Sequence, residues 1–147
     1  SRDGFSASDF HRLCDNKGKT LVLVKNTSGH VFGGFASIPW KSPSSYEHNH
    51  APGSFLFTLT NMYGIQPTKV PLKNENDTNA VYHNNGYGPG FGGGCDFYIS
   101  SNCNTNTNSR AYFPYTYKDT TGNGNSIFSS NTSDNFKVQD CEVFQVC

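Results

Sequence analysis

The clearest hydrophobic pattern in the chain is a pair of apolar runs at residues 21–24 and 31–36, separated by turn residues. The first run is continuous and rich in β-branched residues, which is typical of a strand buried on both faces. The second run contains Gly33 and Gly34, and a glycine within a strand marks a bulge or a close approach by another group. The pattern predicts a hairpin at the centre of a layered β protein, with an edge hairpin in a mixed fold as the alternative.

A helical pattern occurs just before this hairpin. Ser6 is a good N-cap, and Asp9 three residues later completes a capping box. Phe5 and Phe10 have the positions of a hydrophobic staple around the cap. Cys14 falls on the same helical face as Phe10. We expect Cys14 to be a small buried hydrophobe rather than half of a disulfide.

The rest of the chain predicts short strands between turns. Strands are expected at residues 54–60, 65–72, 80–83, 95–100 and 135–146. Two prolines place the strand at 65–72 near a sheet edge. Loops are expected at residues 38–53, 84–94 and 102–110, and residues 122–133 are mostly polar. These elements predict a mostly β fold, a two-sheet antiparallel β-sandwich with a short N-terminal helix, as one domain over residues 1–147.

Charge and hydropathy narrow the classes of partner. The formal net charge is zero and 15% of the residues are charged, so the chain has no electrostatic footprint for nucleic acid or for an anionic membrane surface. No apolar run approaches the length of about 20 residues that spans a membrane. The composition therefore predicts no nucleic-acid partner and no membrane span.

Cysteines and glycosylation sequons favour an extracellular protein, with a cytoplasmic protein as the alternative. Three Asn-x-Ser/Thr sequons begin at Asn26, Asn76 and Asn131. The chain has five cysteines, an odd number that leaves one thiol free or bonded to another chain. The disulfide candidates are Cys95, Cys103, Cys141 and Cys147. The unpaired cysteine, or an aromatic patch, is the expected contact of a homo-oligomer.

Several motifs, in order over nearly the whole chain, resemble the TLDc domain family. They are SRDGFS at 1–6, CDNKG at 14–18, the hairpin at 20–35, FLFTL at 55–59, GPGFGGGCDFYI at 88–99 and FKVQDCEVF at 136–144. The resemblance implies a sandwich of two antiparallel sheets without an agreed catalytic site. For cytoplasmic relatives it implies oxidation resistance and binding to the vacuolar proton pump. Cys141 departs from the family pattern, and Cys95 and Cys147 look additional.

Motifs for cofactors and metals find little support. Gly88, Gly90 and Gly93 match the letters of a dinucleotide-binding loop, but a strand rather than a helix follows them. We therefore expect Gly92 and Gly93 to be structural glycines of a closely packed loop. His48 and His50 have no third metal ligand at a characteristic spacing. The sequence predicts no cofactor and no metal.

Two carboxylates of the last strand have a structural and a catalytic interpretation. Asp140 and Glu142 alternate along the predicted strand and therefore share one face. Such a pair can perform acid–base chemistry, which a hydrolase would use. A carboxylate on an otherwise apolar face more often pairs with a buried arginine. We therefore expect Glu142 to pair with Arg2 or Arg12.

Polar and aromatic residues of the loops favour carbohydrate binding. A sugar ring has apolar C–H patches and hydroxyl groups, so its site needs flat aromatic rings beside fixed polar groups. The expected sugar-binding residues are His83, Asn84, Asn85, Tyr87, Asp96 and Trp40. The alternative is that the tyrosines cap the core and the asparagines form turns.

The leading interpretation is a secreted, non-catalytic, lectin-like protein that binds glycans of glycoproteins, with N-acetylhexosamines among the candidate sugars. The alternative is a TLDc-type regulatory module that binds the vacuolar proton pump or confers oxidation resistance. A hydrolase is the third hypothesis.

Overall fold

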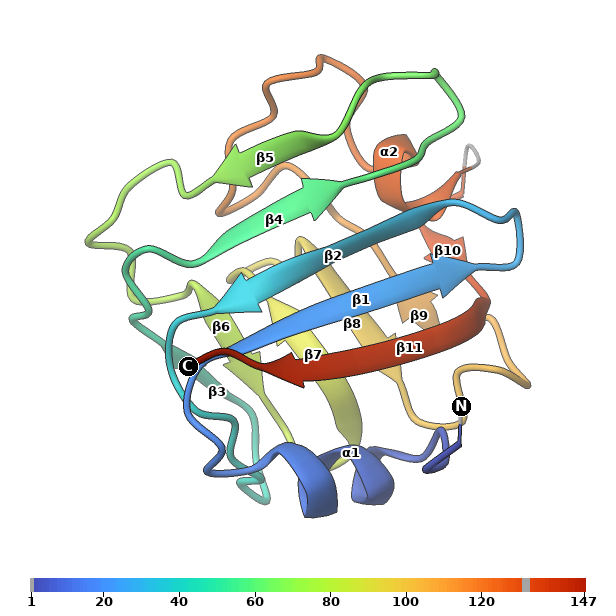
Figure 1. Ribbon diagram of the computed structural model, residues 1–147. Helices are drawn as coiled ribbons and strands as arrows, with labels where there is room; N and C mark the ends of the chain where they lie inside the picture. The colour runs from blue at the N-terminus through green and yellow to red at the C-terminus, as the bar shows by residue number, and fades with distance from the viewer. Residues whose placement is uncertain (1, 131–132) are drawn as a thin grey trace.

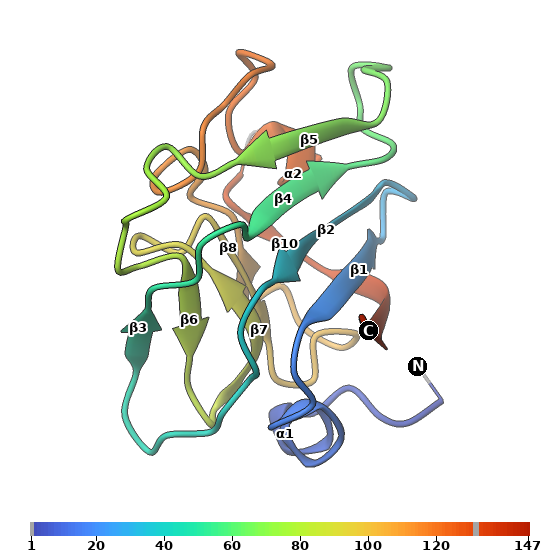
Figure 2. The ribbon, with the colours of Figure 1, turned by 60° about the vertical axis from the view of Figure 1, so that its left-hand side comes forward.

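Two antiparallel sheets pack face to face in the computed structural model, which describes residues 2–130 and 133–147. The strands of the first sheet are, in spatial order, β11 (Val138–Gln145), β1 (Thr20–Asn26), β2 (Val31–Ala36), β4 (Phe55–Thr58) and β5 (Thr68–Pro71). Those of the second are β10 (Asn135–Phe136), β9 (Ser109–Arg110), β8 (Phe97–Ser100), β7 (Tyr87–Phe91), β6 (Val81–His83) and β3 (Glu47–Asn49). Figure 2 shows the two layers from the side. The expected mostly β sandwich is confirmed.

The predicted hairpin forms the middle of the five-stranded sheet, and β5 lies at its edge as the prolines indicate. Val22 and Val24 are fully buried, whereas Leu21 and Leu23 on the opposite face of β1 are half-exposed. The expectation that both faces of the first run are buried is therefore wrong. The continuous apolar run reflects one core face and one half-exposed apolar face.

The two adjacent glycines of β2 occupy positions where a side chain has no room. A Cβ at Gly33 would lie 1.9 Å from the carbonyl oxygen of Val22. A Cβ at Gly34 would lie 2.7 to 3.0 Å from ring atoms of Phe91, which belongs to the opposite sheet. Gly34 therefore lets the two sheets approach at their centre, where Phe91 also contacts Trp40.

Aromatic rings fill most of the core between the sheets. Phe32 of β2 packs edge-on against Phe97 of β8, with 5.4 Å between ring centroids. Phe128 contacts both of these rings and lies in α2 (Ser126–Ser129), a short helix within the segment that the sequence marks as polar. Burying a side chain of this size stabilises the fold by about 1.5–3 kcal/mol.

The helix α1 (Ala7–Cys14) covers one end of the sandwich (Figures 1 and 2). Its capping box is present: the amide of Asp9 donates to the Ser6 hydroxyl at 3.1 Å, and the amide of Ser6 donates to the Asp9 carboxylate at 3.3 Å. Phe5 and Phe10 are half-buried against the core. Cys14 is a half-buried free thiol that also packs there.

Two segments that the sequence predicts as loops contain strands. Residues 47–49 form β3, which pairs with β6 at the sheet edge. Residues 87–91 of the glycine-rich segment form β7, which lies between β6 and β8. Glycine weakens a strand locally, so composition favours a loop, but pairing on both sides holds β7 extended.

The closing strand is divided between the two sheets. Asn135 and Phe136 pair with β9 of the six-stranded sheet. From Val138 onward the chain pairs with β1 of the other sheet. The prediction of one continuous strand at 135–146 is therefore wrong, because the chain changes sheets at Lys137, between β10 and β11.

Candidate functional site

A row of positions in register crosses the outer face of the six-stranded sheet. Cross-strand pairing joins His48 to Tyr82, Tyr82 to Gly90, Gly90 to Tyr98, and Tyr98 to Arg110. Directly opposed residues lie on the same face of a sheet. The strand neighbours of Tyr82 and Tyr98 are buried, so these two tyrosines point outward. We call these five positions the tyrosine row.

Aromatic contacts make this row continuous. His48 and Tyr82 have their ring centroids 5.3 Å apart. The ring centroid of Tyr87, at the start of β7, lies 6.2 Å from that of Tyr82 and 5.1 Å from that of Tyr98. The Tyr82 ring lies across Gly90, where an added Cβ would be 2.7 Å from its Cδ1 atom. The result is a half-exposed aromatic surface with a glycine in its floor.

Polar groups border the row at its β9 end. The Arg110 guanidinium donates to the Tyr112 hydroxyl and lies 5.8 Å from the centroid of that ring. An open depression of about 370 Å³ lies beside it, lined by Gly86, Tyr87, Tyr98, Ser100, Ser101, Asn108 and Arg110. Burial raises the pKa of the phenols of Tyr82 and Tyr98, so near neutral pH both are uncharged hydroxyls that can donate and accept hydrogen bonds.

The turn at residues 84–87 leads into the row. The Asn84 side chain accepts a hydrogen bond from the amide of Gly86 at 2.8 Å, and the Asn84 carbonyl accepts one from the amide of Tyr87 at 3.2 Å. The side chain of Asn85 is exposed. Of the expected sugar-binding residues, Asn84, Asn85 and Tyr87 therefore lie together beside the tyrosine row.

Trp40 and His83 lie inside the sandwich, each with 1% of its surface exposed. The indole N–H of Trp40 donates to the Thr20 hydroxyl at 2.7 Å, and the Trp40 ring packs edge-on against His83. Burial lowers the pKa of His83 to about 4, and neither ring nitrogen has a hydrogen-bond partner within the described chain. The expectation that these two residues contact a sugar is corrected: Trp40 is a core residue, and strand alternation turns His83 inward from Tyr82.

Asp96 is also buried, with 0% exposure, and has a structural environment. Its carboxylate accepts hydrogen bonds from the amides of Tyr115, Thr116 and Tyr117 at 2.8, 2.8 and 3.2 Å. Burial raises the pKa of Asp96, and these backbone bonds act against that rise. Asp96 therefore anchors a loop, which corrects its expected role in sugar binding.

Gly92 and Gly93 belong to the tight turn around this carboxylate. Gly92 has φ +90°, and a Cβ there would lie 1.9 Å from an Asp96 carboxylate oxygen. A Cβ at Gly93 would lie 2.8 Å from the Cβ of Asn79. Both positions therefore exclude a side chain.

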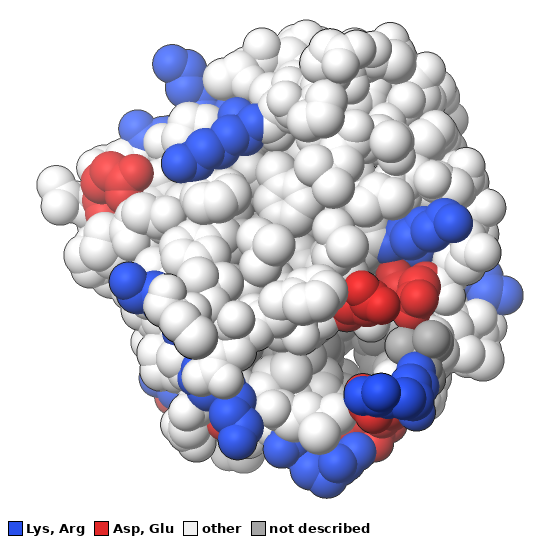
Figure 3. Space-filling model, viewed as in Figure 1, with Lys and Arg blue, Asp and Glu red and all other residues white. Residues whose placement is uncertain are grey.

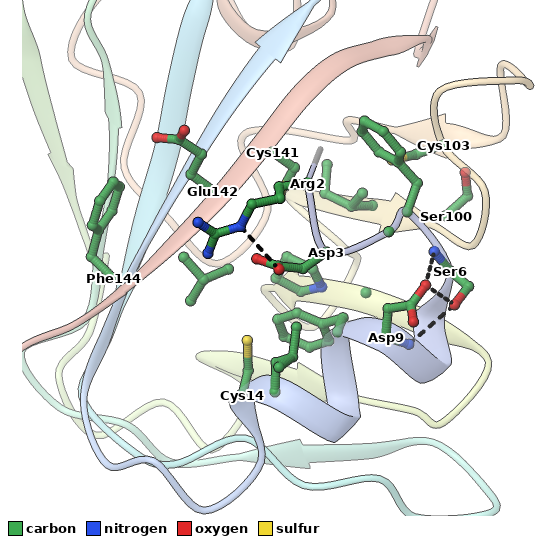
Figure 4. Close-up of a pocket in the computed structure, with 18 residues that line it drawn as sticks. Arg2, Asp3, Ser6, Asp9, Cys14, Ser100, Cys103, Cys141, Glu142 and Phe144 are labelled. Carbon is green, nitrogen blue, oxygen red and sulfur yellow. Dashed lines mark hydrogen bonds and ion pairs between the residues drawn. The ribbon is translucent and has the colours of Figure 1, made fainter.

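A cleft of about 480 Å³ lies between the N-terminal segment, α1, β7–β8 and β11 (Figure 4). Its apolar lining includes Phe5, Phe10, Leu13, Ile99, Val143 and Phe144. Arg2 pairs with Asp3 at the rim, and Arg12 pairs with Asp9, each at 3.3 Å. Glu142 is exposed on β11. The expected buried pair between Glu142 and an arginine is therefore wrong, because Cys141 and Val143 pack against the core and Glu142, which lies between them on β11, faces away.

The five cysteines are all free thiols, so the expected disulfides among Cys95, Cys103, Cys141 and Cys147 are absent from the structure. Cys14, Cys103 and Cys141 line the cleft. Burial raises the pKa of Cys14, Cys95 and Cys103 to about 11 and raises the pKa of Cys141 further. These four thiols are therefore protonated near neutral pH, and Cys147 is exposed.

The sequons differ in their accessibility. Asn26 is 1% exposed, and its amide nitrogen donates to the Phe128 carbonyl and the Ser130 hydroxyl. A glycan on Asn26 is therefore incompatible with the folded chain. Asn76 is exposed in a loop. The sequon that begins at Asn131 lies outside the described residues.

A second row in register crosses the outer face of the five-stranded sheet. Cross-strand pairing joins Phe144 to Leu21, Leu21 to Phe35, Phe35 to Phe55, and Phe55 to Pro71. Phe144 is 49% exposed, and the other four residues of the row are half-buried. We call these positions the apolar row. Figure 3 shows that charged side chains lie around the margin of this face and leave its centre uncharged.

The described residues, 2–130 and 133–147, contain neither a cluster of metal ligands nor a helix that could cross a membrane. No cluster of three or more His, Cys, Asp or Glu side chains in these ranges could hold a metal ion. His50 instead has its Nε2 atom 2.9 Å from the Glu75 carbonyl. No helix of the described chain is long and apolar enough to cross a membrane.

Sequence reasoning found one part of this site and missed another. The alternation of Phe97, Tyr98 and Ile99 already indicates that Tyr98 faces away from its apolar neighbours. Arg110 carries no local signal, because it joins the row through the pairing of β9 with β8. The pairing of His48 with Tyr82 is likewise non-local.

The fold defines a mostly β domain of two sheets with two short helices, and comparison with known families makes the class specific. The family model of the TLDc domain matches residues 1–147. The chain therefore belongs to the TLDc domain family, whose members are generally regulatory modules without catalysis. The resemblance noted in the sequence motifs is confirmed.

A local similarity to a curated protein is also present. The chain is 37% identical over 46 residues to MTOR-associated protein MEAK7 of Danio rerio. The matched segment covers 31% of this chain and 10% of that protein. The chain thus spans a small part of this relative.

Proposed function

We propose that this TLDc domain is a non-catalytic carbohydrate-binding protein that uses the tyrosine row and the turn at residues 84–87 as its binding face. The observation that carries the proposal is the in-register row of half-exposed rings, bordered by hydrogen-bonding groups. Tyr87 links Tyr82 and Tyr98 into one aromatic surface, and Arg110 stands beside it. Asn85 adds an exposed amide at the other side of Tyr87.

The chemistry of this face matches that of a sugar. Tyrosine presents an apolar ring on which the C–H patch of a pyranose can stack and a hydroxyl that stays polar. Amide and guanidinium groups supply donors and acceptors of fixed direction for the sugar hydroxyls. The depression of about 370 Å³ beside Tyr98 has room for a monosaccharide or an N-acetylhexosamine.

The setting that we propose is extracellular, with glycoprotein glycans as ligands. The exposed sequon at Asn76 is compatible with passage through the secretory pathway. Each open site of this kind binds weakly, so a homo-oligomer would gain affinity through multivalency. The apolar row and the exposed Cys147 are the surfaces that we propose for contact between copies.

A second candidate function is a protein-binding regulatory module, including the binding to the vacuolar proton pump that the family resemblance implies. The observation that favours it is the apolar row, whose half-exposed side chains form a contiguous surface without a charged centre. Apolar patches of this kind mark protein-binding sites. This candidate predicts that function is lost on substitution of Phe35 or Phe55 rather than of the tyrosine row.

The test is binding of the purified chain to a glycan array, followed by calorimetry with the sugar that gives the strongest signal. Tyr87→Ala and Tyr98→Ala are expected to reduce affinity by tenfold or more, since stacking on an aromatic ring contributes about 1–3 kcal/mol. Tyr63→Ala is the matched control, because Tyr63 is 45% exposed in a loop outside the row. A blank array, or equal loss in the control, would overturn the proposal.

A further inference from the structure

The buried ring of His11 connects α1 to the turn that carries the proposed sugar-binding residues. His11 is 8% exposed and lies in the second turn of the helix. Its Nε2 atom is 2.9 Å from the Asn84 carbonyl oxygen and 2.9 Å from the Tyr87 carbonyl oxygen. These carbonyls stand at the two ends of the turn at residues 84–87, so one ring nitrogen spans it.

Every hydrogen-bond partner of His11 is an acceptor. Nδ1 lies 2.8 Å from a carboxylate oxygen of Asp15, and Nε2 faces two backbone carbonyls. A neutral imidazole has one N–H donor and one lone pair, whereas the imidazolium has two donors. Only the protonated ring therefore satisfies Asp15 and the turn at the same time.

A neutral His11 can donate a hydrogen bond either to Asp15 or to the turn, but not to both. A hydrogen bond to a carboxylate is about twice as strong as one to a neutral carbonyl. The single proton of the neutral ring would therefore stay on Nδ1, facing Asp15. Nε2 would then direct its lone pair at the carbonyl oxygens of Asn84 and Tyr87, which repel it.

We propose that His11 is a positioning residue that, when protonated, holds the turn at residues 84–87 in its binding conformation and, when neutral, releases it. The expected effect on ligand binding rests on the proposed carbohydrate site, whereas the proton-dependent contact between His11 and the turn does not. Imidazole gives up its proton within the range of about pH 5 to pH 8. Ligand binding is therefore expected to weaken as the pH rises and the His11 ring gives up its proton.

Other charged groups lie around this ring, on its own helix and on neighbouring elements. Asp15 comes from the end of α1, and His83 comes from β6. His83 has a pKa lowered to about 4 by burial and by Lys41, so it is neutral in this range. Lys41 and Glu47 form an ion pair at 2.5 Å, and their effects on the pKa of His83 oppose each other.

The experiment begins with the ligand-free chain, so that it stands apart from the sugar proposal. Nuclear magnetic resonance would follow the His11 ring nitrogens and the amides of Gly86 and Tyr87 from about pH 5 to about pH 8. We expect the two amide shifts to change with the same midpoint as the His11 ring. Amide shifts that stay constant while His11 titrates would overturn the inference.

Three variants distinguish this proton-dependent contact between His11 and the turn from a purely structural role of His11. His11→Gln removes the imidazole ring and with it the exchangeable proton. Asp15→Asn lets a neutral ring keep its proton on Nε2, because the new amide can donate to Nδ1. Both variants are expected to abolish the pH transition of the turn. His50→Gln is the control, since His50 is exposed and bonds to Glu75, and it should retain the transition. A transition that persists in His11→Gln would contradict the proposal.

Binding is measured with serum albumin that carries N-acetylglucosamine as the probe. The apparent dissociation constant of the unmodified chain should rise about tenfold across the transition, as expected for loss of a charge-assisted hydrogen bond, and Asp15→Asn should remain flat. Equal binding of the unmodified chain at both ends of the range would overturn the coupling. If the probe does not bind at any pH but the turn still changes together with His11, the result would contradict the proposed carbohydrate site and support the proton-dependent role of His11.

Discussion

The Tyr82 side chain packs over Gly90 on the next strand, and a Cβ at Gly90 would be 2.7 Å from the Tyr82 Cδ1 atom. The missing side chain at Gly90 thus sets the height of the tyrosine row above the sheet. Tyr82 in turn supports Tyr87 through their ring contact. The shape of the proposed binding face therefore depends on a residue without a side chain.

Gly90→Ala is expected to displace the Tyr82 ring and to weaken sugar binding. Overpacking of this kind costs about 1–3 kcal/mol in the free energy of unfolding. Chemical denaturation measures that cost, and calorimetry measures the affinity. Tyr82→Phe is the companion variant, because it keeps the ring and removes the hydroxyl. Unchanged affinity in Gly90→Ala would show that the row does not form the binding face.

Gly34→Ala is expected to destabilise the sandwich, because the new methyl group would meet the Phe91 ring at 2.7 to 3.0 Å. The free energy of unfolding should fall by about 1–3 kcal/mol. Phe91→Leu alone should also destabilise, by leaving a cavity. The double variant should lose less than the sum of the two, because the smaller side chain makes room for the methyl group. Strict additivity in urea denaturation would contradict this contact.

Stability is expected to fall as the pH drops from about 6.5 to about 4, because the buried His83 stays neutral in the folded chain. The unfolded chain binds a proton near pH 6.5, whereas the folded chain resists it until about pH 4. The unfolded state thus gains stability as the pH falls, on the order of 3 kcal/mol in total. Urea denaturation at several pH values measures this slope. His83→Gln should flatten the slope, and His50→Gln should leave it unchanged.

Cys147 is expected to react first with a thiol reagent in the native chain. It is exposed, whereas burial raises the pKa of Cys14, Cys95 and Cys103 to about 11. Low thiolate content slows attack. Ellman titration should give one fast thiol in the native state and five after denaturation. Cys147→Ser should remove the fast phase, and fewer than five thiols after denaturation would reveal a disulfide.

Features that depend on neighbours in the chain can be predicted from the sequence. The capping box of Ser6 and Asp9 is complete within four residues, and Pro67 and Pro71, which indicate the edge position of β5, are equally local. The TLDc motifs, read in order, predict the sandwich because they extend over the whole chain. These parts of the fold are confirmed.

Which side chains meet depends on how the two sheets are paired and packed. Trp40, His83 and Asp96 have the composition of a sugar site, but burial between the sheets gives them core and anchoring roles. The tyrosine row combines strands that are distant in sequence, so Arg110 joins Tyr98 only through sheet pairing. Hydrogen bonding between strands is non-local and cannot be read from the period of a single strand. Local pattern therefore predicts many of the elements, whereas pairing between strands forms β3 and β7 and the candidate site.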